Sequence, residues 1–238
     1  MNIKVRTVKK QIITATALLL GVITGPALAV EVTGNAGFVT EYLFRGLPQT
    51  DGKAAAQGGI DAAWESGFYL GTWGSSVRSG DSFGGGELIS GESGVEVDLY
   101  GGFSGESGDF NYGAGFTFYT YSDDFDEDYL ELNLSGGWQW LTLDIAIGEY
   151  DTDPEEDYNF YSLTGEWGHF YTTYGNFSDD FDGSYIEFGY TNTLTVAETD
   201  LFDYSISFVH SDEDLFDDDD SENTLIFGVT KSFDISSN

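Results

Sequence analysis

From residue 33 onwards, apolar and polar residues alternate with a period of two along most of the chain. Leu141, Leu143, Ile145 and Ile147 alternate in this way with threonine, aspartate, alanine and glycine. Because successive side chains of a strand point to opposite faces, the pattern predicts strands with one apolar and one polar face. We predict about twelve strands, at residues 33–45, 54–64, 68–77, 94–103, 109–121, 129–138, 140–150, 158–167, 170–177, 184–193, 201–210 and 223–233.

The connections between these strands alternate in length. The short set comprises 65–67, 104–108, Gln139 and 168–169. The long and mostly acidic set comprises 46–53, 78–93, 122–128, 151–157, 178–183 and 211–222, and connection 194–200 is longer than its set predicts. Strands of about ten residues with this asymmetry are typical of an all-β, up-and-down antiparallel transmembrane barrel with short periplasmic turns and long acidic outer loops.

The N-terminus has the pattern of a secretory signal. Lys4, Arg6, Lys9 and Lys10 precede a mostly apolar run that is too short for a transmembrane helix, and Ala27-Leu28-Ala29 gives a small-x-small cleavage site. We therefore predict a signal peptide at 1–29 and an outer-membrane β-barrel at 30–238. The predicted location is the outer membrane of a Gram-negative bacterium.

Composition excludes several classes of protein. The 238 residues include no cysteine, so disulfide scaffolds, cysteine-ligated zinc and thiol catalysis are excluded. The chain has 42 acidic against 8 basic residues and a formal net charge of −34, which argues against nucleic acid as a partner. An aromatic content of 16% does not fit intrinsic disorder.

Aromatic residues gather near both ends of the predicted strands. A barrel in a membrane places such rings at the two lipid–water interfaces, so we interpret them as two belts. The alternative is a secreted β-sandwich or a soluble lipocalin-like barrel, in which the apolar face points inward. The belt beside the short turns comprises Trp64, Phe68, Trp138, Trp140, Trp167 and Phe170, and the opposite belt comprises Tyr42, Phe44, Tyr119, Tyr121, Tyr150 and Tyr158.

Residues 41–77 carry a longer motif. It reads Tyr42-x-Phe44-Arg45-Gly46, then Gln49, then Gln57-Gly58-Gly59-x-Asp61, then Ser66-Gly67-Phe68-Tyr69-x-Gly71-x-Trp73-x-Ser75. This motif resembles the TorF family of proposed porins, which are conserved proteobacterial proteins. The likeness covers the first three predicted strands, with Ala54 where the family has proline. The resemblance implies an outer-membrane barrel that conducts solutes, and it implies no established substrate and no catalytic residues.

Assigning the apolar parity of each strand to lipid leaves the other parity facing the lumen. Arg45 is the one base on this inner face, so it cannot neutralise the acids there, and unpaired buried charge is costly. We therefore expect a water-filled, acid-lined lumen that favours cations. The acids assigned to the inner face are Glu41, Asp61, Glu96, Asp98, Glu131, Asp144, Glu166, Glu187 and Asp203.

Three of these residues are expected to meet. Glu41 and Arg45 lie four apart on the first predicted strand, and Asp61 lies on its neighbour. We predict that Arg45 sits between the two carboxylates and forms a constriction of the pore. The alternative is structural, with Arg45 tying the first two strands together and having no part in permeation.

The acidic loops raise the question of metal binding. No cofactor and no tight metal site are expected, because the spacing of Asp151, Asp153 and Glu155 lacks the glycine and downstream glutamate of an EF-hand. Loosely bound Ca²⁺ or Mg²⁺ at these residues or at Asp217, Asp218, Asp219 and Asp220, bridging to lipopolysaccharide, stays open. A plain solvated surface is the alternative.

Enzymatic activity is not expected. His169 falls in a short turn, and His210 and Ser211 are neighbours on one strand, so their side chains point in opposite directions. The sequence instead predicts a porin that passes small cationic or neutral solutes by diffusion. The alternative is a non-conducting barrel that acts through its acidic outer loops, by binding divalent cations or a partner or by supporting the envelope. Outer-membrane lipid, lipopolysaccharide and the barrel-assembly machinery are the other expected partners.

Overall fold

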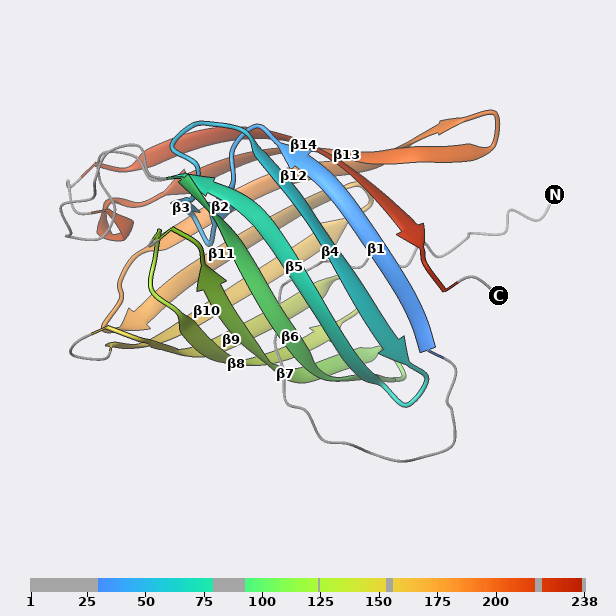
Figure 1. The fold of residues 1–238 in the computed structure, drawn as a ribbon, viewed down its shortest axis with the longest axis horizontal. Helices are drawn as coiled ribbons and strands as arrows, with labels where there is room; N and C mark the ends of the chain where they lie inside the picture. The colour runs from blue at the N-terminus through green and yellow to red at the C-terminus, as the bar shows by residue number, and fades with distance from the viewer. Residues whose placement is uncertain (1–29, 79–92, 124, 153–155, 217–219, 237–238) are drawn as a thin grey trace.

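Twelve antiparallel strands close into a barrel in the computed structural model, which describes residues 30–78, 93–123, 125–152, 156–216 and 220–236 (Figure 1). The predicted all-β barrel with about twelve strands is confirmed. The barrel strands are β1 (Val30–Val39), β4 (Ala55–Trp64), β5 (Phe68–Arg78), β6 (Ser93–Ser107), β7 (Phe110–Tyr121), β8 (Tyr129–Trp138), β9 (Leu141–Tyr150), β10 (Glu156–Trp167), β11 (Phe170–Asp179), β12 (Ser184–Val196), β13 (Thr199–Ser211) and β14 (Glu222–Asp234).

Each barrel strand pairs with its neighbours in sequence, and β1 closes the barrel against β14, with Gly37 opposite Thr230. A single 3₁₀ turn at Glu213–Leu215 is the only helical element in the described part of the chain. Within those ranges, no helix is long and apolar enough to cross a membrane. The described ends of β1 and β14 both lie at the end of the barrel that carries the short turns, which we call the turn end; the opposite end is the loop end (Figure 1).

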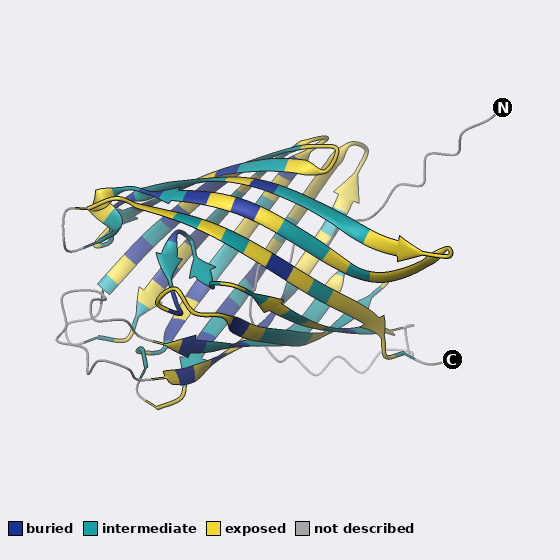
Figure 2. Ribbon diagram, turned by 90° about the horizontal axis from the view of Figure 1, so that it is seen from above, coloured by how far each residue is buried: buried dark blue, intermediate teal, exposed yellow. Residues whose placement is uncertain are grey.

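Burial alternates along the barrel strands, as the striped colouring of Figure 2 shows. On β6, Val95, Val97 and Leu99 are exposed on the outside, whereas Glu96 and Asp98 are buried inside. The outer surface is thus apolar along the length of the strands. This is the reverse of the soluble barrel considered as an alternative, because that fold turns its apolar face inward.

The observed strand boundaries differ most from the predicted ones at three places: the end of β6, which reaches Ser107 instead of residue 103, the turn between β12 and β13, and the end of the first strand. β12 and β13 run on beyond the expected limits and leave only Ala197 and Glu198 between them, with φ of 48° and 66°. Two left-handed residues make the tight turn that suits a hairpin, so the long connection predicted at 194–200 is wrong. The first strand ends at Val39 rather than at residue 45, because the following segment turns into the barrel.

That segment, residues 40–54, is here called the plug loop. Its centre is a small hairpin of β2 (Leu43–Phe44) and β3 (Leu47–Pro48), joined by Arg45 and Gly46. Both turn residues have positive φ, 51° and 88°, which is the geometry of a type I′ turn. Figure 1 shows the hairpin within the loop end of the barrel.

The plug loop packs against a cluster of aromatic side chains inside the loop end. Phe44 and Leu47 of the hairpin contact this cluster, and the Phe44 ring lies 5.6 Å from that of Tyr119. The buried members of the cluster are Tyr119, Tyr129, Ala146, Tyr158, Phe160 and Phe177. The barrel therefore has an aromatic core at one end, in place of an open lumen.

This core corrects the interpretation of the aromatic belts. Tyr119 and Tyr158 occupy the inward parity of their strands and are buried, so they do not form a belt at the loop end. Five of the six turn-end aromatics behave as predicted, because they are exposed on the outside, whereas Trp64 is half-buried. The five are Phe68, Trp138, Trp140, Trp167 and Phe170. The rings of the two predicted belts thus differ in direction, because those at the loop end point into the barrel and those at the turn end point outward.

Candidate functional site

Arg45, at the tip of the plug loop, crosses the lumen to Glu131 on β8. Its Nη1 and Nη2 donate to Glu131 Oε1 and Oε2 at 2.5 and 3.0 Å, a bidentate ion pair. The guanidinium also lies over the rings of Phe44 and Phe160, at 4.6 and 4.3 Å from their centroids. Planar, bidentate pairing combined with stacking is the geometry that arginine alone provides.

Glu131 is fully buried, with 0% of its side chain exposed, and its oxygens are well supplied with donors. Besides Arg45, the hydroxyls of Tyr119 and Tyr158 donate to it at 3.0 and 2.6 Å, and Asn133 Nδ2 donates at 2.9 Å. A buried charge is tolerated when it is paired and hydrogen-bonded in this way. The Arg45–Glu131 pair therefore fastens the plug loop to the far wall of the barrel.

The predicted constriction of Glu41, Arg45 and Asp61 is wrong. Glu41 lies in the plug loop and accepts a hydrogen bond from the Gly52 backbone at 3.0 Å, while Asp61 accepts one from the Tyr100 hydroxyl at 2.5 Å. The reason is that Arg45 sits in a hairpin turn instead of on β1, so its side chain reaches across the lumen and not along the wall.

Glu96 and Asp98 lie beside the plug loop on the inner face of β6, each 1% exposed. The Tyr42 hydroxyl of the plug loop donates to Glu96 Oε1 at 3.1 Å, and the Tyr42 ring meets Trp73 edge-on at 5.6 Å. Together with Glu131, these acids are sealed from solvent. The predicted water-filled lumen therefore does not extend to these three acids, because the plug loop occupies the space in front of them.

The other predicted acids on strands all face the lumen and are less buried. Glu187 accepts from the Tyr171 hydroxyl at 2.6 Å, and Asp203 accepts from the Thr193 hydroxyl at 2.5 Å. Asp61, Asp144, Glu166 and Glu187 are half-buried and Asp203 is exposed. The inner parity of these strands was thus predicted correctly, although burial within the lumen was not.

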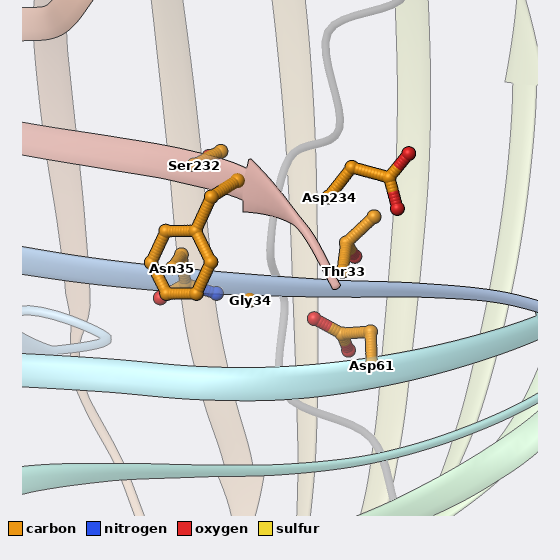
Figure 3. A pocket seen from close by; sticks show the side chains of 7 residues that line it. Thr33, Gly34, Asn35, Asp61, Ser232 and Asp234 are labelled. Atoms are coloured by element: carbon orange, nitrogen blue, oxygen red, sulfur yellow. The ribbon is translucent and has the colours of Figure 1, made fainter. Parts of the chain in front are cut away.

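A cavity of about 220 Å³ lies near the turn end, where β14, β1 and β4 run side by side. Asp61 of β4 and Asp234 of β14 lie on either side of Thr33 of β1, each directly opposite it in the strand register (Figure 3). Asn35 and Ser232, a directly paired couple on β1 and β14, complete its polar lining. This polar, half-exposed wall contrasts with the aromatic core at the loop end.

The loop acids proposed for loose metal binding are only partly described. Asp151 and Asp220 are exposed, whereas Asp153, Glu155, Asp217, Asp218 and Asp219 lie outside the described residues. Within the described ranges, no group of three or more histidine, cysteine or acidic side chains lies together in a way that could hold a metal ion. The predicted signal peptide at 1–29 also lies outside the described residues.

Asp126, in the connection between β7 and β8, has a perturbed carboxyl group. Burial raises its pKa to about 6, although a hydrogen bond from the Tyr150 hydroxyl acts in the opposite direction. Its charge therefore changes in a pH range that a bacterium encounters.

The two histidines lie apart from each other. His169 is in the turn before β11, with its ring 5.8 Å from Tyr190, and His210 Nδ1 lies 3.1 Å from Asn223 Oδ1. Ser211, next to His210, points inward and donates to the Gly46 carbonyl at 2.7 Å. Neither histidine has a serine hydroxyl among its hydrogen-bond partners in the described ranges.

Sequence reasoning missed the Arg45–Glu131 pair. The available signal was Arg45-Gly46 between Phe44 and Leu47, since a residue pair ending in glycine between apolar residues favours a tight hairpin. The partner of Arg45 could not be predicted from the sequence. Because Arg45 lies in a loop inside the barrel and not on a barrel strand, every inward-facing acid was a possible partner.

Comparisons with known proteins show the family to which the chain belongs. A family profile described as a bacterial protein of unknown function, Gcw_chp, matches residues 24–201. None of the curated proteins matches the chain. Among solved structures, OccK1 (OpdK) of Pseudomonas aeruginosa is similar with a TM-score of 0.38 and 12% identity, over 76% of this chain and 57% of that one. The chain thus spans little more than half the length of that structure.

Proposed function

The chain belongs to the Gcw_chp family, and we propose that it is an outer-membrane channel that passes small cationic or neutral solutes by diffusion. The proposal includes no enzymatic activity and no required cofactor. It places the barrel in the outer membrane of a Gram-negative bacterium, surrounded by lipid and lipopolysaccharide after delivery by the barrel-assembly machinery. The resemblance of residues 41–77 to the TorF porins supports the same function.

The observation that carries the proposal is the inverted distribution of apolar and polar side chains. Apolar residues cover the outside of the twelve strands, and carboxylates line the inside. A closed barrel with an apolar outer surface leaves no unpaired strand edge, which suits a lipid surrounding. Carboxylates along the lumen create a negative potential, and this attracts cations and repels anions.

The plug loop makes the loop end the place where passage is controlled. Its aromatic packing and the Arg45–Glu131 pair fill that end of the lumen. We propose that solutes pass when the plug loop leaves its position on the far wall, and that the turn end is a permanently wet vestibule. Asp61, Glu187 and Asp203 are the acids that we assign to the ion path there.

The alternative is a non-conducting barrel that works through its outer loops. The observation that favours it is the number of donors that hold Glu131, since a plug fixed so firmly is suited to a structural role. In that case the lumen acids serve the packing of the plug, and the exposed loops bind divalent cations or a partner.

Planar bilayer recording tests the proposal. We expect purified wild-type protein to give conductance steps whose reversal potential in a salt gradient indicates cation preference. Asp61→Asn combined with Asp203→Asn should reduce that preference, because both charges are removed from the lumen. Glu149→Gln is the matched control, since Glu149 is an exposed acid on the outward parity of β9.

Silent bilayers with both wild-type protein and Arg45→Ala, despite correct insertion, would favour the non-conducting alternative. Conductance with equal passage of anions and cations would retain the channel and overturn its cation preference.

A further inference from the structure

Glu96 and Asp98 are two buried acids for which the described residues provide no compensating positive charge. Both carboxyl groups are 1% exposed, and they project from the same face of β6 toward the plug loop. Within the described ranges, Glu96 Oε2 and both oxygens of Asp98 are buried with no hydrogen-bond partner. Among the described residues, the donor bonded to this pair is the Tyr42 hydroxyl, which donates to Glu96 Oε1.

Arg45 does not compensate these charges. Its guanidinium is bidentate to Glu131. The other described lysines and arginine stand elsewhere: Arg78 is exposed at the end of β5, Lys53 is exposed beside Asp51, and Lys231 is bonded to the Asp200 carbonyl. Two adjacent buried carboxylates without a cation would be strongly unfavourable. A positive charge must therefore be supplied to them.

A proton alone is not sufficient. The two carboxyl groups lie close enough for a hydrogen bond between them when one is protonated. That bond would occupy two of the three free oxygens, and it would leave one negative charge and one oxygen without a partner. Two protons would remove the charge, with each hydroxyl donating to the carbonyl oxygen of the other acid, and this is the state against which a bound cation has to be tested.

We propose that Glu96 and Asp98, covered by Tyr42 of the plug loop, form an enclosed site for one hard divalent cation, with Ca²⁺ the best fit. Three free carboxylate oxygens, with Glu96 Oε1 and the Tyr42 hydroxyl beside them, offer the oxygen ligands that Ca²⁺ prefers. Its double charge balances two ionised carboxylates. Mg²⁺ fits less well, because it keeps several waters in a strict octahedron and this site is closed to solvent.

The neighbouring wall adds a further oxygen and a built-in reporter. Ser75 lies directly opposite Glu96 in the β5–β6 register, and Trp73 lies directly opposite Asp98. A bound cation would join β6 to Tyr42, so it would hold the plug loop on this side as Arg45 holds it on the other. The inference is separate from conduction, since a sealed site binds its ion whether or not solutes pass.

Terbium luminescence in the full-length, folded protein is the test. Tb³⁺ replaces Ca²⁺ at oxygen sites and emits when an adjacent excited tryptophan or tyrosine transfers energy to it. We expect wild-type protein to bind one Tb³⁺ tightly, with emission sensitised when tryptophan alone is excited, and to release the ion to excess Ca²⁺. This tryptophan-sensitised emission should be lost in Trp73→Phe, whereas excitation of tyrosine should still sensitise the ion through Tyr42. Glu96→Gln combined with Asp98→Asn should weaken this binding more than about a hundredfold, because ligands themselves are removed.

The exposed loop acids provide the matched control. Asp151→Asn combined with Asp220→Asn removes two carboxylates outside the lumen, so the tight site should be unchanged. If the double variant in the lumen does not fold, Asp98→Asn alone replaces it, and Ca²⁺ should then raise the unfolding temperature of wild-type protein more than that of the variant.

Two outcomes would overturn the proposal. One is equal Tb³⁺ affinity and stoichiometry in wild-type protein and the lumen variants, which would assign all binding to the loops. The other is the absence of any Ca²⁺ effect on wild-type stability together with a more stable double variant, which would indicate a carboxyl pair neutralised by protons. Silent bilayers would leave the proposal intact.

Discussion

The two ends of this barrel enclose the same kind of strand and yet have different interiors. At the turn end, connections of two or three residues cap the strands, and the inner wall shows polar side chains around a cavity. At the loop end, one connection of fifteen residues, 40–54, folds inward and meets an aromatic core. The difference arises from one connection, because alternation along the strands is similar at both ends.

Whether an acid inside the barrel needs a partner depends on which end it occupies. An acid at the turn end needs no partner, since water reaches it, whereas an acid at the loop end must be paired, protonated or bound to a cation. Glu131 has the arginine, whereas in the described part of the chain the Tyr42 hydroxyl is the donor at Glu96 and none is found at Asp98. The same residue type therefore has a different role at each end.

Of the changes considered, removing the arginine should reduce the difference between the two ends of the barrel most strongly. In Arg45→Ala, Glu131 loses its cation and stays buried, which costs about 3 kcal/mol or more and corresponds to roughly a hundredfold shift toward an open plug loop. We expect faster hydrogen exchange at residues 42–50 and larger conductance steps. Lys53→Ala, which removes an exposed base from the same loop, is the control, and equal effects of the two variants would refute the role of the ion pair.

A glycine pair separates backbone strain from packing. A Cβ at Gly46 would lie 2.8 Å from Tyr185 Cβ, whereas a Cβ at Gly52 would have no atom within 4 Å, and both residues have positive φ. Both alanine variants lose about 1 kcal/mol from left-handed backbone strain, and Gly46→Ala should lose more. Limited proteolysis of the plug loop measures the difference, and equal cleavage rates would contradict the packing described here.

The smallest expected effect is a pH dependence at the loop end. The pKa of Asp126 is raised to about 6 by burial, so its contribution to stability is complete below the usual carboxyl range and is lost as pH rises through 6. Once exchange rates are corrected for the intrinsic rate at each pH, the connection between β7 and β8 should be less protected at pH 7.5 than at pH 5. Asp126→Asn should abolish this difference, and a difference of the same size in the variant would refute the assignment.

Much of the barrel could be predicted because a period of two depends only on neighbours in the chain. The boundaries of β8, with Tyr129 and Trp138 at its ends, were predicted without error, and the inward parity of Glu96, Glu131 and Asp203 was correct. Each strand has one apolar and one polar face, so alternation within the strand is enough to predict which side chains point into the barrel.

The plug loop could not be predicted in this way. Tyr42 and Phe44 continue the alternation of β1, so the pattern extended the strand to residue 45, whereas the structure ends it at Val39. What decides the outcome is contact between Phe44 and Tyr119 and between Arg45 and Glu131, and these residues are far apart in sequence. Tertiary packing overrode a local signal here.

Accessibility of single cysteines measures the division of the lumen most directly, because the chain has no cysteine of its own. Ser75 and Ser232 are both inward-facing serines. Ser75 lies beside the plug loop and is 1% exposed, whereas Ser232 is exposed and lines the turn-end cavity. We predict that Ser232→Cys reacts readily with a small, positively charged thiol reagent, that Ser75→Cys is protected, and that adding Arg45→Ala exposes Ser75→Cys. Equal reaction rates at the two positions in otherwise wild-type protein would contradict a lumen divided by the plug loop.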